Sequence, residues 1–110
     1  MRVISLGSGS SGNALLVEAG PQRRTKVLID AGLKGRLLIE RLRRVGVSPN
    51  QLQGVLLTHE HSDHIVGLPT LMNRYAIPLI ADPRTIEAVQ NTFISSTWRT
   101  DAGSLLTRGI

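Results

Sequence analysis

The sequence predicts one domain of the α/β class, in which helices are layered on a β-sheet. Three apolar runs, at 27–29, 54–57 and 77–81, have the length of strands, and segments with helical periodicity lie between and after them. This alternation of strand and helix after residue 26 is typical of a layered α/β domain. A chain of 110 residues with 41% hydrophobic content has room for one globular domain at most.

The first part of the chain has the pattern of a β-hairpin followed by a third strand. We expect strands at 1–6 and 13–18, joined by a Gly/Ser loop, because the second apolar run is too short for a helix. This length also excludes a dinucleotide-binding loop, although the loop's glycines spell G-x-G-x-x-G, since that motif must open a helix. The continuous apolar run in the third strand, at 26–30, predicts burial on both faces.

An amphipathic helix is expected at 33–45. Leu38, Leu42 and Val45 recur at helical spacing, and Gly46 stands where a helix C-terminal cap belongs. The solvated face of this helix is predicted to carry four arginines, namely Arg36, Arg41, Arg43 and Arg44.

A second helix is predicted after the strand at 54–57 and the polar turn that follows it. Its apolar face consists of Ile65, Leu68, Met72 and Tyr75. We expect Met72 and Tyr75 to belong to the core rather than to a binding site. Pro69 falls within the first turns, where the loss of a backbone N–H is least harmful.

The last predicted elements are a strand at 77–81 and a helix that begins after it. Asp82 can cap the helix, and Pro83 suits its first position. This helix is expected to end near Asn91. From Thr92 onward the residues are mostly polar, and no further element is predicted.

All three histidines of the chain fall within the six residues 59–64, directly after a predicted strand. Imidazole and carboxylate groups are the usual protein ligands of zinc and similar divalent ions. Residues two apart on a strand point to the same side, so His59 and His61 can bind one metal ion. Asp63 and His64 are neighbours on the following turn and can face a second ion. In the alternative, a solvated polar turn, Asp63 only supports the helix dipole, but three histidines at set offsets favour the metal site.

Three segments resemble the metallo-β-lactamase-fold hydrolases. Thr58–Gly67 (T-H-E-H-S-D-H-I-V-G) is similar to their metal-binding motif, and Val27–Gly32 is similar to an earlier motif with an aspartate at a strand end. The opening Ser5–Asn13 resembles the YycJ-like branch, which is taken to consist of metal-dependent phosphodiesterases or DNA exonucleases. The resemblance implies that residues 1–110 form the N-terminal half of an αββα sandwich, a partial domain with metals at one edge of the packed sheets.

The resemblance also implies a site for two divalent ions, Zn²⁺ or Mn²⁺. His59 and His61 would hold the first ion and His64 the second, while Asp63 would bind an ion and orient the attacking hydroxide in catalysis. Four ligands do not complete two such sites. Family members supply the others from a downstream half, and this sequence has no histidine after His64. We therefore expect a truncated or partial sequence that is inactive by itself.

Two further features acquire a role through the resemblance. Asp30 ends an apolar strand and has two possible roles. It either pairs with the local backbone in a turn, or it holds residues 59–64, the metal loop or histidine loop, in place through hydrogen bonds. The resemblance favours the second role. It also places the Gly/Ser loop beside the active site, where a substrate phosphate could meet the side chains of Ser8, Ser10, Ser11 and Asn13.

The charge of the chain is consistent with a nucleic-acid substrate. The net charge is +5 and the pI is near 11.1. Of the 13 basic residues only Lys26 and Lys34 are lysines, so 11 are arginines, which could equally reflect genome composition. The three aromatic residues are scattered and form no base-stacking platform.

The sequence therefore predicts a metal-dependent phosphodiesterase or nuclease. Two alternatives remain open, namely a thioester or lactam hydrolase of the same superfamily and an inactive partial domain that binds metal weakly. The chain has no cysteine and hence no disulfide or thiolate metal site. It also lacks a signal-peptide pattern and any apolar run of membrane-spanning length, so a cytoplasmic protein without a membrane partner is expected.

Overall fold

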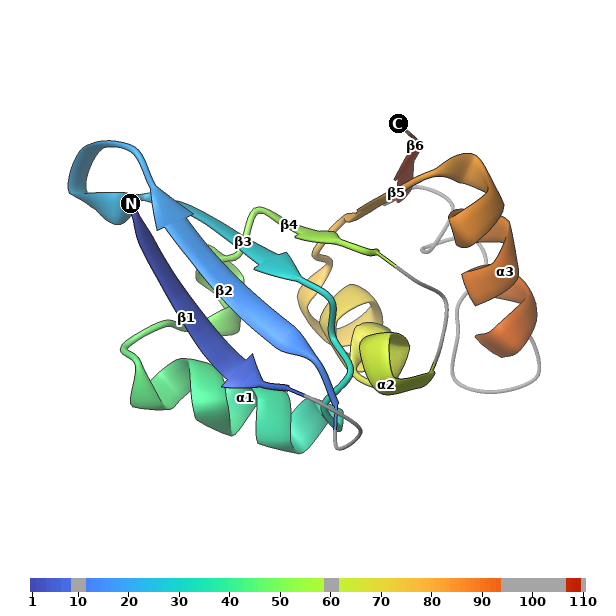
Figure 1. Ribbon diagram of the computed structural model, residues 1–110, viewed down its shortest axis with the longest axis horizontal. Coiled ribbons are helices and arrows are strands. Elements are labelled where there is room, and N and C mark those ends of the chain that lie inside the picture. The colour runs from blue at the N-terminus through green and yellow to red at the C-terminus, as the bar shows by residue number, and fades with distance from the viewer. Residues whose placement is uncertain (9–11, 59–61, 94–106, 110) are drawn as a thin grey trace.

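The computed structural model describes residues 1–8, 12–58, 62–93 and 107–109 (Figure 1). Within them, six strands form one sheet in which each strand pairs with its neighbours in sequence. The first three strands are antiparallel, and the third to the sixth are parallel. The strands are β1 Arg2–Gly7, β2 Ala14–Ala19, β3 Thr25–Ile29, β4 Gly54–Leu56, β5 Leu79–Ala81 and β6 Thr107–Gly109.

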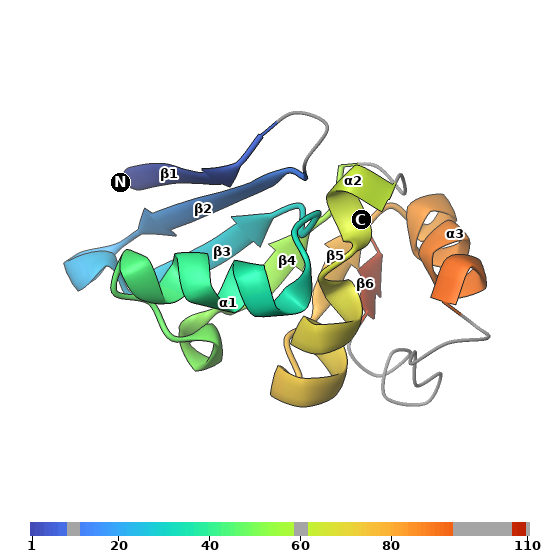
Figure 2. The same cartoon turned by 90° about the horizontal axis from the view of Figure 1, so that it is seen from below.

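Helices connect the parallel strands, which confirms the predicted α/β class. They are α1 Gly35–Arg44, α2 Ser62–Ile65, η4 Thr70–Arg74 and α3 Pro83–Phe93, with the short turns η2 Pro21–Arg23 and η3 Pro49–Gln51. Figure 2 shows α1 and η4 on the same side of the sheet. The part of the chain that the structure describes contains no helix long and apolar enough to cross a membrane.

The core lies between this helical layer and one face of the sheet. Cross-strand pairing aligns a row of apolar side chains on that face, and the row is formed by Leu16, Leu28, Val55 and Leu79. All four are 0% exposed. They pack in one cluster with Leu38 and Leu42 of α1, which confirms the apolar face predicted for that helix. Gly46 follows α1 with φ of 80°, a left-handed conformation that glycine adopts without strain at a helix end.

The opposite face of the sheet is apolar but only partly covered. Its side chains are Val3, Leu15, Val17, Val27, Ile29, Leu56 and Ile80, aligned in cross-strand rows. Val3 is 52% exposed, and the others are half-buried. The prediction that β3 is buried on both faces is therefore wrong for this chain, because only Leu28 of its apolar run is fully buried. A continuous apolar run indicates that both faces of a strand are apolar, but it does not show that both are covered. Among the described residues, no layer covers the face of β3 that points away from the helices.

The predicted second helix is interrupted. The α-helix α2 ends at Ile65, and the π-helical segment η4 follows. Pro69 has no N–H to donate to the carbonyl of Ile65, and its ring crowds that carbonyl, so regular α-helical bonding ends there. Met72 is nevertheless buried, as predicted, while Tyr75 is half-buried and packs against the edge of the core.

The last elements differ from the prediction in extent. Helix α3 begins at Pro83, and Asp82 Oδ1 accepts a hydrogen bond of 2.8 Å from the Arg84 backbone N–H, as its capping role predicts. The helix continues to Phe93, two residues beyond the predicted end. Strand β6 was not predicted, because three residues carry no periodicity and only pairing with β5 identifies them.

A buried ion triad fastens the antiparallel strands to α1. Glu18, 1% exposed on β2, pairs with Arg2 of β1 and Lys26 of β3. Arg2 also donates a 3.4 Å hydrogen bond to the Val45 carbonyl at the end of α1. Arg41 donates a 2.7 Å hydrogen bond to the Leu6 carbonyl, so this residue does not lie on the solvated face of α1 as predicted.

Replacing Glu18 by glutamine is expected to destabilise the fold in a pH-dependent way. Hydrogen bonds from Lys26 and then Arg2 lower the pKa of Glu18. The ionised carboxylate therefore stabilises the fold above the ordinary glutamate pKa, and this contribution is lost as the pH falls through the folded-state pKa. We expect Glu18→Gln to cost about 3 kcal/mol near pH 7, because it leaves two cations without their buried partner.

Chemical denaturation at neutral pH and near pH 3 measures this cost. The matched control is Glu40→Gln, since Glu40 forms an exposed pair with Arg44 on α1. The control should cost no more than about 0.5 kcal/mol at either pH. A Glu18→Gln penalty that is equally large at both pH values would contradict the role of the ionised carboxylate.

Candidate metal centre

Asp30 is the residue on which the candidate site is built. It directly follows β3, and its backbone has φ of 62°, a left-handed conformation that aspartate tolerates better than most residues. Its backbone N–H donates a 2.8 Å hydrogen bond to the Leu56 carbonyl of β4. This bond extends the β3–β4 pairing by one position and turns the carboxylate towards the segment that follows β4.

The carboxylate of Asp30 is buried, with 6% of the residue exposed, and it binds two later segments. Oδ1 accepts a 2.8 Å hydrogen bond from the Thr58 backbone N–H, and Oδ2 accepts one of 2.6 Å from the Thr58 hydroxyl. His64 Nδ1 lies 2.8 Å from Oδ2. Three bonds thus compensate the burial of the charge. They also connect the end of β3 to both ends of the histidine loop.

The Asp30–His64 contact determines how the imidazole can act. Because a carboxylate only accepts hydrogen bonds, Nδ1 carries the proton, and Nε2 is the nitrogen that would bind a metal. Histidines that ligate metals usually donate their other N–H to a carboxylate or a carbonyl. The Asp30–His64 pair therefore has the chemistry of a histidine that is oriented to bind a divalent metal ion through Nε2.

Backbone hydrogen bonds lock the same region together. Ala31 N–H donates to the His64 carbonyl at 2.7 Å, and Gly67 N–H donates to the Ala31 carbonyl at 2.6 Å. A Cβ on Gly67 would lie 2.6 Å from the Leu33 carbonyl oxygen, so only glycine allows this approach. Gly32 N–H donates to the Asn13 carbonyl at 2.9 Å, which ties the Gly/Ser hairpin to the segment after β3.

A hollow of about 230 Å³ lies at this junction. Asp30 and His64 line it together with Ser8 and Asn13 of the hairpin, so four of the sequence-predicted residues are brought together. Leu15 and Ile29, from the incompletely covered sheet face, complete one wall. The hollow therefore lies at the edge of the half-buried sheet face, next to the carboxyl end of β3.

The remaining predicted residues are placed only in part or not at all. Asp63 lies in α2 by its backbone, between Ser62 and His64. His59, His61, Ser10 and Ser11 lie outside the described residues. No group of three potential ligands gathers among the side chains that the structure describes.

Thr58 was not predicted as part of the site. It is the first residue of the histidine motif, and both its N–H and its hydroxyl donate hydrogen bonds to the Asp30 carboxylate. The signal that could have identified it is a hydroxyl residue directly between a strand end and the first histidine. Such a residue is well placed to bond a carboxylate on the neighbouring parallel strand.

These observations define an α/β domain whose sheet carries a histidine-rich loop at the carboxyl end of β4, tied to the end of β3. Residues 7–101 match the family model described as the metallo-beta-lactamase superfamily. The chain belongs to this superfamily. The predicted fold class and family resemblance are thereby confirmed.

Three named relatives agree with this assignment. The chain is 40% identical over 87 residues to exodeoxyribonuclease WalJ of Streptococcus pneumoniae, covering 79% of this chain and 31% of the relative. It is 40% identical over 86 residues to exodeoxyribonuclease YycJ of Bacillus anthracis, covering 78% and 31%. It is also 37% identical over 108 residues to ribonuclease Z of Mycolicibacterium gilvum, covering 83% and 36%.

The fold is similar to that of a B3 metallo-beta-lactamase with an active-site glutamic acid. The TM-score is 0.68 at 23% identity, and the match covers 80% of this chain and 32% of that one. At this identity the likeness concerns the fold alone. The chain spans about a third of the length of the exodeoxyribonucleases that it matches.

Proposed function

We propose that this chain contributes the metal loop of a metal-dependent nuclease, a phosphodiesterase that acts on nucleic acid. The observation that carries the proposal is the Asp30 carboxylate bonded to both Thr58 and His64 Nδ1, in a chain 40% identical to two proteins named exodeoxyribonucleases. A similar chain named ribonuclease Z supports nucleic acid as the substrate class, without deciding between DNA and RNA.

The proposed metal ligands are His59, His61, Asp63 and His64. Two divalent ions, zinc or manganese, would when bound supply Lewis acidity and activate water for attack on phosphorus. In this proposal Asp63 also orients the attacking water, and Asp30 holds His64 in the orientation that presents Nε2. These four ligands do not complete two metal sites, so the remaining ligands would come from another part of the domain.

The substrate phosphate is proposed to enter the hollow beside His64. Ser8 and Asn13 line that hollow and offer a hydroxyl and an amide to phosphate oxygens. Ser10 and Ser11, on the same loop, are proposed to contribute further hydroxyls. The net charge of +5 favours a polyanionic substrate and so a nucleic acid over a lactam or thioester. We also propose that the protein acts in the cytoplasm, because a nuclease needs access to cellular nucleic acid.

We further propose that residues 1–110 are one part of a larger αββα domain. The apolar face formed by side chains such as Leu15, Val17, Val27 and Ile29 is half-buried, and a second sheet would bury it. Because the hollow opens at the edge of this face, the second layer would also be placed to supply the missing ligands.

The test is cleavage of labelled DNA and RNA by the intact protein that contains this chain, with Zn²⁺ or Mn²⁺ added. We expect turnover of at least one nucleic acid and none of a lactam or a thioester. The double variant His59→Ala/His61→Ala should lose this turnover, and the 110-residue chain alone should show none because its two metal sites are incomplete. Turnover of the lactam or thioester with no cleavage of nucleic acid would refute the proposed substrate class.

A further inference from the structure

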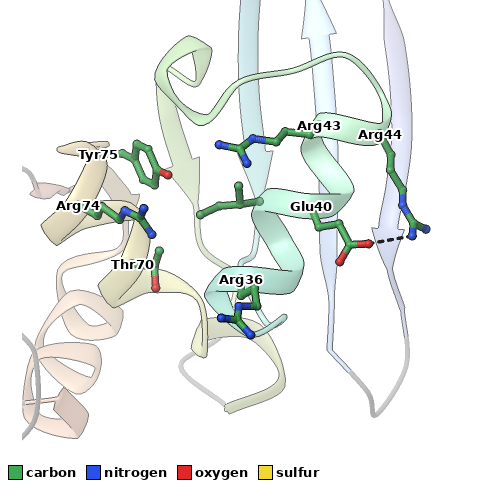
Figure 3. Close-up of a pocket in the computed structure, with 8 residues that line it drawn as sticks. Arg36, Glu40, Arg43, Arg44, Thr70, Arg74 and Tyr75 are labelled. Atoms are coloured by element: carbon green, nitrogen blue, oxygen red, sulfur yellow. Dashed lines mark hydrogen bonds and ion pairs between the residues drawn. The ribbon is translucent and has the colours of Figure 1, made fainter.

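A second cavity lies in the helical layer between α1 and η4 and shares no described lining residue with the hollow beside Asp30 and His64. Its volume is about 780 Å³, and we name it the basic groove. Arg36 and Arg43 of α1 line it on one side, and Thr70, Arg74 and Tyr75 line it on the other, over a floor that includes Ile39. Figure 3 shows the side chains of Arg36, Arg43 and Arg74 around the space between the two helices.

The positive charge of the basic groove is incompletely neutralised. Glu40, the one acidic residue among its described lining, accepts a 2.8 Å hydrogen bond from Arg44 at the rim and so neutralises that arginine. Among the described side chains, Arg36 and Arg43 form no ion pair. Arg74 lies over the ring of Tyr75, with its guanidinium carbon 5.5 Å from the ring centre. Three exposed guanidinium groups therefore face a cavity with an apolar floor.

The spacing of these groups indicates a ligand with several anionic groups. Arg36 and Arg43 are seven residues apart on α1, which places them on one helix face about 10 Å apart along its axis. Figure 3 accordingly shows them at opposite ends of the basic groove. A chain of phosphates can contact both ends, and guanidinium is the side-chain group best matched to phosphate geometry.

The basic groove is connected to the candidate metal centre through the backbone. Helix α1 begins five residues after Asp30, and Gly35 at its start lies against Thr70 so closely that a Cβ would be 2.1 Å from the Thr70 hydroxyl oxygen. The α2–η4 segment is bonded to the residue after Asp30 through Gly67. The basic groove therefore lies between α1, which follows β3 and Asp30 in the chain, and η4, which follows the histidine loop.

We propose that the basic groove binds the phosphate backbone of the nucleic acid outside the metal site. This inference rests on the proposed nuclease function for its substrate class. The arginines would hold the strand without reading its bases, because backbone contacts position a nucleic acid but carry no sequence information directly. The sparse aromatic residues of the chain agree with a groove that works through charge.

The test measures binding of labelled single-stranded DNA to the intact protein by fluorescence anisotropy, with metal removed by chelation. The variant is Arg36→Gln/Arg43→Gln. The matched control is Arg23→Gln/Arg24→Gln, which removes the same charge from exposed residues at the β2–β3 turn. We expect the groove variant to bind roughly tenfold more weakly at low salt and the control to bind nearly as the unmodified protein does.

Salt dependence provides the second readout. Each lost phosphate contact should reduce the magnitude of the slope of log K against log salt by about 0.7, so the groove variant should lose about 1.4. The inference would be overturned if the two double variants weakened DNA binding equally. It would also be overturned if polyglutamate bound as tightly as DNA and its binding depended on the same arginines. Binding without metal does not require cleavage, so failure of the basic groove and failure of the proposed nuclease activity are distinguishable.

Discussion

Replacing His64 by alanine in the intact protein is expected to remove one metal ion per chain. The substitution deletes the imidazole whose Nδ1 is 2.8 Å from Asp30 Oδ2 and whose Nε2 is the proposed ligand. The affinity of that site should fall by more than the roughly 10–100-fold typical of residues that only orient ligands. Elemental analysis after dialysis against a trace of zinc measures the loss directly.

The fold itself should tolerate this change. The His64 carbonyl, which accepts the Ala31 N–H, belongs to the backbone and stays in place. Thermal unfolding in the presence of a chelator should therefore show only the loss of one of the three hydrogen bonds to the Asp30 carboxylate, about 1–2 kcal/mol. If the variant retained its full metal content, His64 would be a structural partner of Asp30 and not a ligand.

The change Asp30→Asn is expected to cost roughly 10–100-fold in metal affinity. The amide oxygen can still accept the Thr58 N–H, but the amide nitrogen would then face the Thr58 hydroxyl and His64 Nδ1, where Oδ2 now accepts. His64 would have to accept at Nδ1 and carry its proton on Nε2, which blocks metal binding at that nitrogen.

The matched control is Asp82→Asn, the same isosteric change at the start of α3. Asp82 caps the helix through the Arg84 N–H, and asparagine caps about as well as aspartate. Competition with a chromophoric chelator should show weaker binding for Asp30→Asn and unchanged binding for Asp82→Asn. An unchanged affinity in both variants would leave Asp30 as a residue that only supports the turn after β3.

Much of the fold and part of the site could be predicted because their determinants are local. The apolar spacing of α1, its glycine cap and the cap at Asp82 each act within a few residues, so the pattern alone placed these elements. The histidine loop is also local, since four potential ligands fall within residues 59–64. The same pattern favoured one regular helix after the loop, and Pro69 and the close approach of Gly67 overrode it.

The tertiary structure alone decided which distant residues meet. Sequence could suggest that Asp30 serves the metal loop, but only the parallel pairing of β3 with β4 brings its carboxylate to Thr58 and His64. Packing between elements also places Arg41 against the Leu6 carbonyl instead of in solvent. In the same way it places Arg36 and Arg43 opposite Arg74 across the basic groove. Periodicity determines which face of an element is apolar, whereas contacts between elements depend on packing across the whole domain.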